Sequence, residues 1–261
     1  MMTEKKMKLG LIPGVAKEAL QEDWDGALKR LADMGYEGVE MSMGTLEQSG
    51  MSAADCRTSL ESHGLEAMSF FAGWGPFDTE AEDHIQAAQD LGCDYMVWGW
   101  SPCDESDQMA KVMPVMHKAA SMVKSAGMQL LYHNHDHEFK NRVKDQAGFD
   151  WLMGAFHREL LESELDVGWV AYGGRDVVAT IEQYAGRCPI LHMRDVGNPD
   201  ERGKFIEIGN GVLDIAGIIR AGYEKGGSDW AIVEHSRNME HESFEGLQIA
   251  ADNLRQAIDG L

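Results

Sequence analysis

At residues 130–139 the sequence reads Leu130-Leu131-Tyr132-His133-Asn134-His135-Asp136-His137-Glu138-Phe139. The apolar start is typical of a buried β-strand, and the polar residues that follow are typical of a strand end. Residues two apart on an extended chain share a face, so we expect Leu131, His133 and His135 to point the same way. An isolated histidine is more often an ordinary surface or core group. Three at alternate positions beside a carboxylate favour a metal or substrate site instead.

Other apolar runs along the chain also predict short strands, and amphipathic segments with helical spacing follow most of them. In addition to the run that begins at residue 130, the predicted strands are residues 9–12, 38–41, 65–71, 95–98, 161–168, 190–196 and 230–235. The predicted helices lie near residues 27–34, 52–64, 105–126, 151–156, 176–185, 215–221 and 242–258. Pro114 is expected to kink the helix that contains it or to mark its first turn. Segments 72–77 and 198–210 predict loops.

The alternation of strands and helices predicts the fold class. Strand-then-helix units of roughly 30 residues, with no linker rich in proline or serine between them, indicate a parallel sheet. Eight such units most simply close into a (β/α)8 TIM barrel, which we expect to form one domain over residues 1–261. A doubly wound open sheet is the alternative, but no G-x-G-x-x-G motif follows the first strand.

The net charge of the chain disfavours some classes of binding partner. The chain carries 44 acidic and 23 basic residues, which gives a formal net charge of -21. Such a surface repels phosphate backbones and anionic lipids, so we expect neither a nucleic-acid partner nor a membrane partner.

The cysteines and the N-terminus predict a cytoplasmic protein. Four cysteines stand at positions 56, 93, 103 and 188 without C-x-x-C pairing, and we interpret them as free thiols in a reducing compartment. The charged start of the chain is followed by too few apolar residues for a secretory signal, and no run approaches the roughly 20 apolar residues of a membrane span.

Chemically active side chains recur where the predicted strands end. In a parallel barrel these ends meet on one face, which is where the active sites of such folds lie. The second strand and the fifth to eighth strands each place a nitrogen or carboxylate donor there. The residues are Glu40, His133, His135, Asp166, His192, Glu234 and His235. This coincidence predicts a site more specifically than any single motif does.

Several of these residues also have ordinary structural interpretations. Asp166 precedes a turn-forming Val-Gly pair, so a helix cap is an alternative to a ligand role. His192 lies in an apolar strand, where hydrogen-bonded core histidines are common. A buried, unpaired Glu234 would cost several kcal/mol, which favours a cation as its partner. Three roles are possible for Glu40: it could lie beside a metal site, contact the substrate or accept a structural hydrogen bond.

Aromatic residues are expected around the same face. They are Trp74, Phe77, Trp98, Trp100 and Trp169. Ordinary packing accounts for them, and stacking on a sugar ring is the alternative interpretation.

The strand-end motifs resemble those of a known family. They are Tyr132-His133-Asn134-His135, Leu165-Asp166-Val167-Gly168, Leu191-His192-Met193-Arg194-Asp195, Ile208-Gly209-Asn210-Gly211 and Val233-Glu234-His235. This set is similar to that of the sugar phosphate isomerase/epimerase family of xylose isomerase-like TIM barrels, which includes a 3-keto-glycoside isomerase and lyase branch. The likeness extends from about Lys8 to the C-terminal helix. It implies the fold and a metal site. It does not specify the substrate, because the family includes epimerases, inosose dehydratases, lyases and a distant endonuclease branch.

The resemblance implies a divalent metal ion held by the fifth to eighth strands. Manganese is the usual ion, with magnesium, zinc and cobalt as alternatives. Asp166, His192 and Glu234 match three ligand positions of the family. Where many members have Glu-Asn, this chain has His133-Asn134, and we expect His133 to be the fourth ligand because it stands in register with that glutamate. His135 and Glu138 are the alternatives.

The chemistry implied by the resemblance is proton transfer next to the carbonyl of a keto sugar, through an enediolate. In the epimerases two metal-bound glutamates act as the acid and the base, and His133 in place of one makes the pair unequal. The expected catalytic residues are therefore Glu234, His135 and His133. This set suits isomerase or epimerase chemistry, with β-elimination or hydration by a lyase or dehydratase as the alternative.

The resemblance also suggests partners. The expected substrate is a small carbohydrate, and the candidate contacts are Arg194, Glu40, Trp100 and Glu138. Arg194 is expected either to bind a substrate oxygen or phosphate or to form a salt bridge. Members of the family are commonly dimers or tetramers, which implies a homo-oligomer. An endonuclease is disfavoured by the net charge, and a non-catalytic sugar-binding protein by the complete ligand set.

Overall fold

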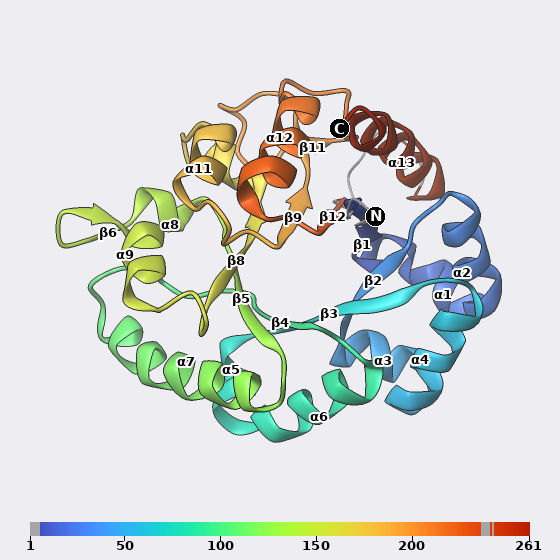
Figure 1. Ribbon diagram of the computed structural model, residues 1–261, viewed down its shortest axis with the longest axis horizontal. Helices are drawn as coiled ribbons and strands as arrows, with labels where there is room; N and C mark the ends of the chain where they lie inside the picture. Colours follow the sequence, from blue (N-terminus) through green and yellow to red (C-terminus); the bar gives the residue numbers. More distant parts are fainter. Residues whose placement is uncertain (1–5, 236–240, 242) are drawn as a thin grey trace, which may run out of the picture.

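Parallel strands close into an eight-stranded barrel in the computed structural model, which describes residues 6–235, 241 and 243–261 (Figure 1). In order around the barrel the strands are β1 (Lys8–Leu11), β12 (Trp230–Val233), β9 (Ile190–Met193), β8 (Glu162–Asp166), β5 (Gln129–His133), β4 (Tyr95–Trp98), β3 (Glu66–Ala72) and β2 (Gly38–Ser42). Because β1 pairs with both β12 and β2, the barrel has no open edge.

Helices form a ring outside the strands (Figure 1). They are α1 (Lys17–Glu22), α2 (Trp24–Asp33), α3 (Met43–Ser49), α4 (Ala53–Ser62), α5 (Trp74–Thr79), α6 (Ala81–Leu91), α7 (Asp107–Ser125), α8 (His137–Lys140), α9 (Gly148–Ala155), α10 (Val167–Tyr172), α11 (Val177–Gln183), α12 (Ile215–Ala221) and α13 (Ser243–Asp259), with the short turns η1 (Pro13–Ala16) and η2 (Gly222–Gly226). Two small antiparallel ladders join β6 (Arg142–Val143) to β7 (Gln146–Ala147) and β10 (Asp195–Val196) to β11 (Phe205–Ile206).

The interior of the barrel changes from apolar to polar along the strands. Buried side chains of alternate strand residues form an apolar layer, made by Met68, Val97, Leu131, Ile190, Trp230 and Ile232. Two residues further along three of these strands stand His133, His192 and Glu234. Since residues two apart on a strand share a face, the strands that build the apolar layer also direct these three side chains inward, just above it.

The predicted barrel is confirmed, and each predicted strand overlaps a strand of the barrel. The predicted sixth strand, 161–168, includes Val167 and Gly168, which begin α10, and the predicted eighth strand, 230–235, extends two residues past Val233. The seventh strand ends at Met193, while Asp195–Val196 belongs to the ladder with β11. The predicted loop at 198–210 contains the short strand Phe205–Ile206. The prediction for residues 1–5 and for Glu242 as the start of the last helix lies outside the described residues.

The prediction of a loop at residues 72–77 was wrong. Residues Trp74–Thr79 form helix α5. Pro76 stands in the first turn of this helix, where a proline is tolerated because the first N–H groups have no partner within the helix. Phe77 is buried and stacks on Trp98, with ring centroids 5.1 Å apart, so these two aromatic rings belong to the core.

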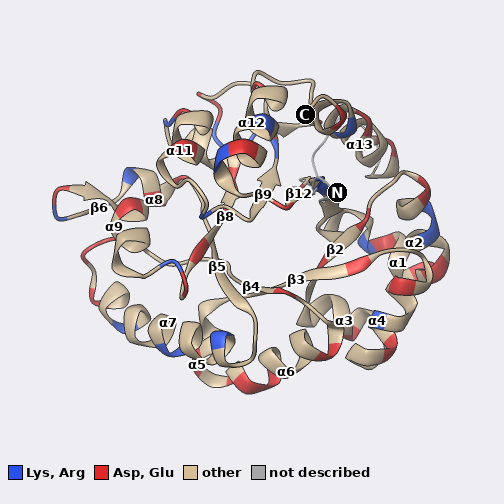
Figure 2. Ribbon diagram, viewed as in Figure 1, with Lys and Arg blue, Asp and Glu red and all other residues tan. Residues whose placement is uncertain are grey.

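The structure shows where the acidic residues and the cysteines lie. Most Asp and Glu residues lie on the helices and loops outside the barrel (Figure 2). The four cysteines are free and buried. Among the described residues, no helix combines the length and apolar character that crossing a bilayer requires.

Substitution of two glycines of α9 tests the packing of this helix against the rest of the fold. A Cβ at Gly148 would lie 2.1 Å from the backbone oxygen of Cys103, whereas a Cβ at Gly154 would meet nothing within 4 Å. We expect Gly148→Ala to lower the free energy of unfolding by about 1–3 kcal/mol, because backbone must move to admit the methyl group. Gly154→Ala should leave it unchanged or raise it by about 1 kcal/mol. Urea denaturation measures both, and equal effects would contradict the packing described.

Candidate metal centre

Four side chains predicted to bind a metal converge at the carboxyl end of the barrel. They are His133, Asp166, His192 and Glu234, and each offers one donor atom within 4.8 Å of the others. They come from β5, β8 and β9 and from the residue that follows β12, which are neighbours in the barrel. The first three are buried, and the Glu234 side chain is 22% exposed.

Asn134 fixes the end of β5 to the end of β8. Its side-chain nitrogen donates to the backbone oxygen of Asp166 (3.2 Å), and its side-chain oxygen accepts from the backbone N–H of Asp166 (3.0 Å). The amide therefore continues the ladder between the two strands beyond its last backbone pair. This contact holds His133 and Asp166 at the same level of the barrel.

Arg194 joins two carboxylates of the cluster. Its Nε donates to Asp166 Oδ2 at 2.8 Å, and its terminal nitrogen forms an ion pair with Glu234. The other oxygen of Asp166 accepts from the Trp169 backbone N–H (2.8 Å) and caps α10. The salt-bridge interpretation of Arg194 and the helix-cap interpretation of Asp166 thus both describe real contacts. They do not exclude a role for either residue in binding a ligand.

A carboxylate that we did not predict lies beneath the histidines. Glu164 of β8 is fully buried, with Oε2 at 3.1 Å from His133 Nδ1 and Oε1 at 3.2 Å from His192 Nε2. Glu40 of β2 lies beside it, 3.5 Å from His192 Nε2, and accepts a hydrogen bond from Ser69 Oγ (2.7 Å). The signal for Glu164 was its position two residues before Asp166, which places both on the same face of the strand.

Burial and neighbouring charges set the protonation of the cluster. Burial, reinforced by the charge of Glu164, raises the pKa of Glu40 to about 7. Burial, with the neighbouring His192, lowers the pKa of His133 to about 4. Burial also acts to lower the pKa of His192, but Glu164 and Glu40 outweigh it and hold that pKa well above its usual value. Burial opposes ionisation of Glu234, yet Arg194 and His192 hold its pKa well below its usual range.

The donor set fits a divalent cation. Two imidazoles and two carboxylates are nitrogen and oxygen ligands of the kind that zinc, manganese and cobalt accept. Arg194 and His192, whose raised pKa favours its charged form, supply positive charge among the carboxylates of Glu40, Glu164, Asp166 and Glu234. A cation bound at His192 would take the place of the proton that this ring carries. His133, Asp166, His192 and Glu234 are the residues that would hold the cation.

His135 lies next to this cluster and faces the same cavity. Its ring is 5.1 Å from that of His133, and its Nδ1 is buried without a hydrogen-bond partner among the described residues. Burial, together with the neighbouring His133, lowers its pKa to about 3. Its imidazole is therefore neutral at physiological pH and able to accept a proton.

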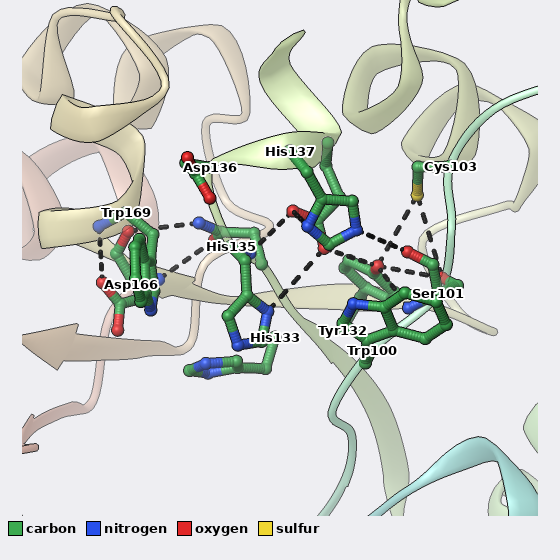
Figure 3. A network of polar contacts seen from close by, with 12 residues as sticks. Trp100, Ser101, Cys103, Tyr132, His133, His135, Asp136, His137, Asp166 and Trp169 are labelled. Atoms are coloured by element: carbon green, nitrogen blue, oxygen red, sulfur yellow. Dashed lines mark hydrogen bonds and ion pairs between the residues drawn. The ribbon is translucent and has the colours of Figure 1, made fainter. Parts of the chain in front are cut away.

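Glu138 belongs to a separate group. It lies in the short helix α8, and its carboxylate accepts from Tyr132 Oη (2.9 Å) and from the backbone N–H of His135 (2.8 Å). Burial raises its pKa to about 8. His135, His137 and Glu138 form their own set of donor atoms within 4.8 Å. Figure 3 shows His137 directed toward Ser101, whose backbone oxygen lies 2.8 Å from His137 Nε2.

The cavity next to the cluster has a volume of about 230 Å³. It is lined by Ile12, Pro13, Glu40, Met41, Ser42, Thr45, Phe71, His133, His135 and Glu234. Of this lining, Glu40, His133, His135 and Glu234 were predicted from the sequence. The others were not, although Ile12 and Pro13 follow Leu11, and Met41 and Ser42 follow Glu40, at the ends of their strands. Trp100 is 37% exposed and packs near His137, with ring centroids 5.6 Å apart. The described lining includes neither Trp100 nor Glu138.

The family model for the xylose isomerase-like TIM barrel matches residues 28–259. The chain belongs to the xylose isomerase-like TIM barrel family. An inosose dehydratase of Geobacillus kaustophilus is 25% identical to the chain over an alignment 263 positions long, which covers 85% of this chain and 82% of the relative.

Solved structures of other xylose isomerase-like barrels have the same fold. A sugar phosphate isomerase/epimerase from Parabacteroides distasonis superposes with a TM-score of 0.80 at 24% identity, covering 98% of this chain and 96% of that one. The IolI protein, whose structure has a bound zinc atom, superposes with a TM-score of 0.75 at 16% identity, covering 97% and 99%. At these identities the likeness shows the fold, while the reaction and the metal have to be argued from this chain's own residues.

Metal binding distinguishes the cluster of His133, Asp166, His192 and Glu234 from the group of His135, His137 and Glu138. Removal of a hydrogen-bond partner of a metal ligand typically weakens metal binding by about 10- to 100-fold. Because His133→Ala removes a ligand itself, we expect it to weaken Mn²⁺ binding by at least as much. His137→Ala removes the same side chain from the other group and should leave the affinity unchanged. Isothermal titration calorimetry measures both. Loss of binding in His137→Ala with retention in His133→Ala would place the ion at His135, His137 and Glu138 instead.

Proposed function

We propose that this protein is a metal-dependent enzyme that removes a proton from the carbon next to the carbonyl of a small keto sugar or keto polyol. The proposal rests on one observation, which is that the cluster of possible metal ligands borders a cavity. His133 and Glu234 belong to the cluster and also line the cavity, together with His135. Bases and cation ligands would thus face the same bound molecule.

The bound cation would polarise the carbonyl of the substrate and stabilise the negative charge that develops on its oxygens. Glu234 is ionised because Arg194 and His192 favour its charged form. His135 is neutral because burial disfavours its charged form. Either side chain can therefore accept a proton from the substrate. Having accepted it, the same group can return the proton or deliver it to a neighbouring oxygen.

The fate of that proton separates two reactions. Its return to the other face of the carbon, or to the neighbouring carbon, gives an epimerase or isomerase, which is the reaction we propose first. Loss of a hydroxyl from the next carbon gives a dehydratase. The likeness to an inosose dehydratase over 85% of the chain favours this second candidate. His133 in place of a carboxylate also favours it, because the acid and base that line the cavity are then Glu234 and an imidazole, of His133 or His135, in place of two equivalent glutamates.

The cavity supports a small neutral substrate. Its volume of about 230 Å³ lies below the roughly 300–1,000 Å³ of pockets that hold drug-sized ligands, which suits a single sugar ring. Its described lining contains acidic groups and imidazoles but neither lysine nor arginine, which disfavours a phosphorylated ring. Manganese is our first choice of metal, because two of the four donors are carboxylates.

Hydrogen exchange tests the proposed step. Inosose, D-fructose and a 3-keto-glucoside are incubated in D₂O with the manganese-loaded protein and followed by proton NMR. We expect deuterium to enter next to the carbonyl of at least one of them. Glu234→Gln and His135→Gln should each slow the exchange by at least about 100-fold, the lower range for general acid–base groups.

The control for this test is His137→Gln, which alters an imidazole two residues beyond His135 that does not line the cavity. It should exchange at the wild-type rate. An epimeric product supports the isomerase, and an unsaturated product formed with loss of water supports the dehydratase. Full exchange in both Glu234→Gln and His135→Gln would contradict the proposal.

A further inference from the structure

One buried carboxylate contacts two imidazoles of the candidate metal centre. Glu164 Oε2 lies 3.1 Å from His133 Nδ1, and Glu164 Oε1 lies 3.2 Å from His192 Nε2. Glu164 and His192 are fully buried, and His133 is 3% exposed. The first contact is a hydrogen bond. The second is an ion-pair contact, in which Glu164 Oε1 and His192 Nε2 have no hydrogen-bond partner among the described residues.

The strand order explains why a single residue can reach both rings. Strand β8 lies between β5 and β9 in the barrel. Glu164 stands opposite His133 in the register of β8 with β5, and Asp166, two residues later, stands opposite His192 in the register with β9. Glu164 thus lies between the two histidines, in register with His133 and two residues before Asp166 on the same face of β8. Glu40, by comparison, lies 3.5 Å from His192 Nε2.

The contacts of Glu164 leave one nitrogen of each ring for a ligand. The other nitrogen of His192, Nδ1, lies 3.1 Å from Glu234 Oε2, on the side of the candidate ligands. For His133 the contact with Glu164 uses Nδ1, which leaves Nε2 for a ligand. A neutral imidazole carries its proton on one nitrogen only. The hydrogen bond to Glu164 would hold that proton on Nδ1 of His133. Both nitrogens of His192 face a carboxylate, so a cation bound at its Nδ1 would leave the proton on Nε2, toward Glu164.

We propose that Glu164 is the positioning residue of the metal centre, which fixes the orientation and the tautomer of both His133 and His192. The proposal rests on the metal centre proposed above. In this arrangement His133 is the Nδ1–H tautomer and His192 the Nε2–H tautomer, so the two rings bind the cation through different nitrogens. Glu164 also adds a negative charge behind two neutral ligands, which strengthens their donation to a cation.

Metal affinity and tautomer state test this inference together. We expect Glu164→Gln to weaken Zn²⁺ and Mn²⁺ binding by about 10- to 100-fold, because an amide cannot accept from both rings. Glu164→Asp keeps the charge on a shorter side chain and should give an intermediate loss. The matched control is Glu162→Gln, on the same strand two residues earlier, which pairs with Arg158 and should bind as the wild type does.

Long-range ¹H–¹⁵N NMR of the zinc-loaded protein gives a readout that a merely structural role would not move. The wild type should show His133 protonated at Nδ1 and His192 at Nε2, and Glu164→Gln should lose at least one of these tautomers. Unchanged affinity and tautomers in Glu164→Gln would overturn the inference while leaving the metal centre standing. Two ions per wild-type chain and one in Glu164→Gln would also overturn it, because Glu164 would then be a ligand itself. Failure of the wild type to bind any ion would instead overturn the metal centre.

Discussion

The structure depends on how charge is compensated inside a closed barrel. Four carboxylates, from Glu40, Glu164, Asp166 and Glu234, meet around His192 and Arg194 at the carboxyl end of the barrel. Below them lies an apolar layer of side chains from β3, β4, β5, β9 and β12. Since a closed sheet allows no strand to shift alone, each charge has to be balanced by its neighbours or by a bound cation. The contacts of the candidate centre follow from this requirement.

The adjacent residues Arg194 and Asp195 make different kinds of contact. Arg194 points into the cluster, whereas Asp195 points away and accepts from the backbone N–H groups of Gly209 and Gly211, both at 2.9 Å. A Cβ at Gly211 would lie 2.1 Å from Asp195 Oδ1, which explains why a glycine stands there. The Ile-Gly-Asn-Gly motif therefore supports the scaffold beside the centre, while the strand before it supplies His192 and Arg194.

The sequence was sufficient to predict the barrel and the four converging donors, because both follow from periodicity. Apolar runs set the strands, and residues at their ends must meet in a parallel barrel. Glu164 was missed because the run Glu162-Ser163-Glu164-Leu165-Asp166 is polar, and we weighed only its last residue. Helix α5 was missed because Gly73, Gly75 and Pro76 favour a loop, while burial of Phe77 against Trp98 favours the helix. Such packing depends on residues distant in sequence, which local patterns do not contain.

We propose that His133, Asp166, His192 and Glu234 surround a cation, and that Glu164 contacts the far nitrogens of its two histidine ligands. Anomalous diffraction at the manganese edge, from crystals of the manganese-loaded protein, locates this ion. We expect one anomalous peak within bonding distance of these four side chains, with His133 Nε2 and His192 Nδ1 toward the ion and Glu164 next to the opposite nitrogens. A peak between His135, His137 and Glu138, or one bound directly by Glu164, would contradict the proposal.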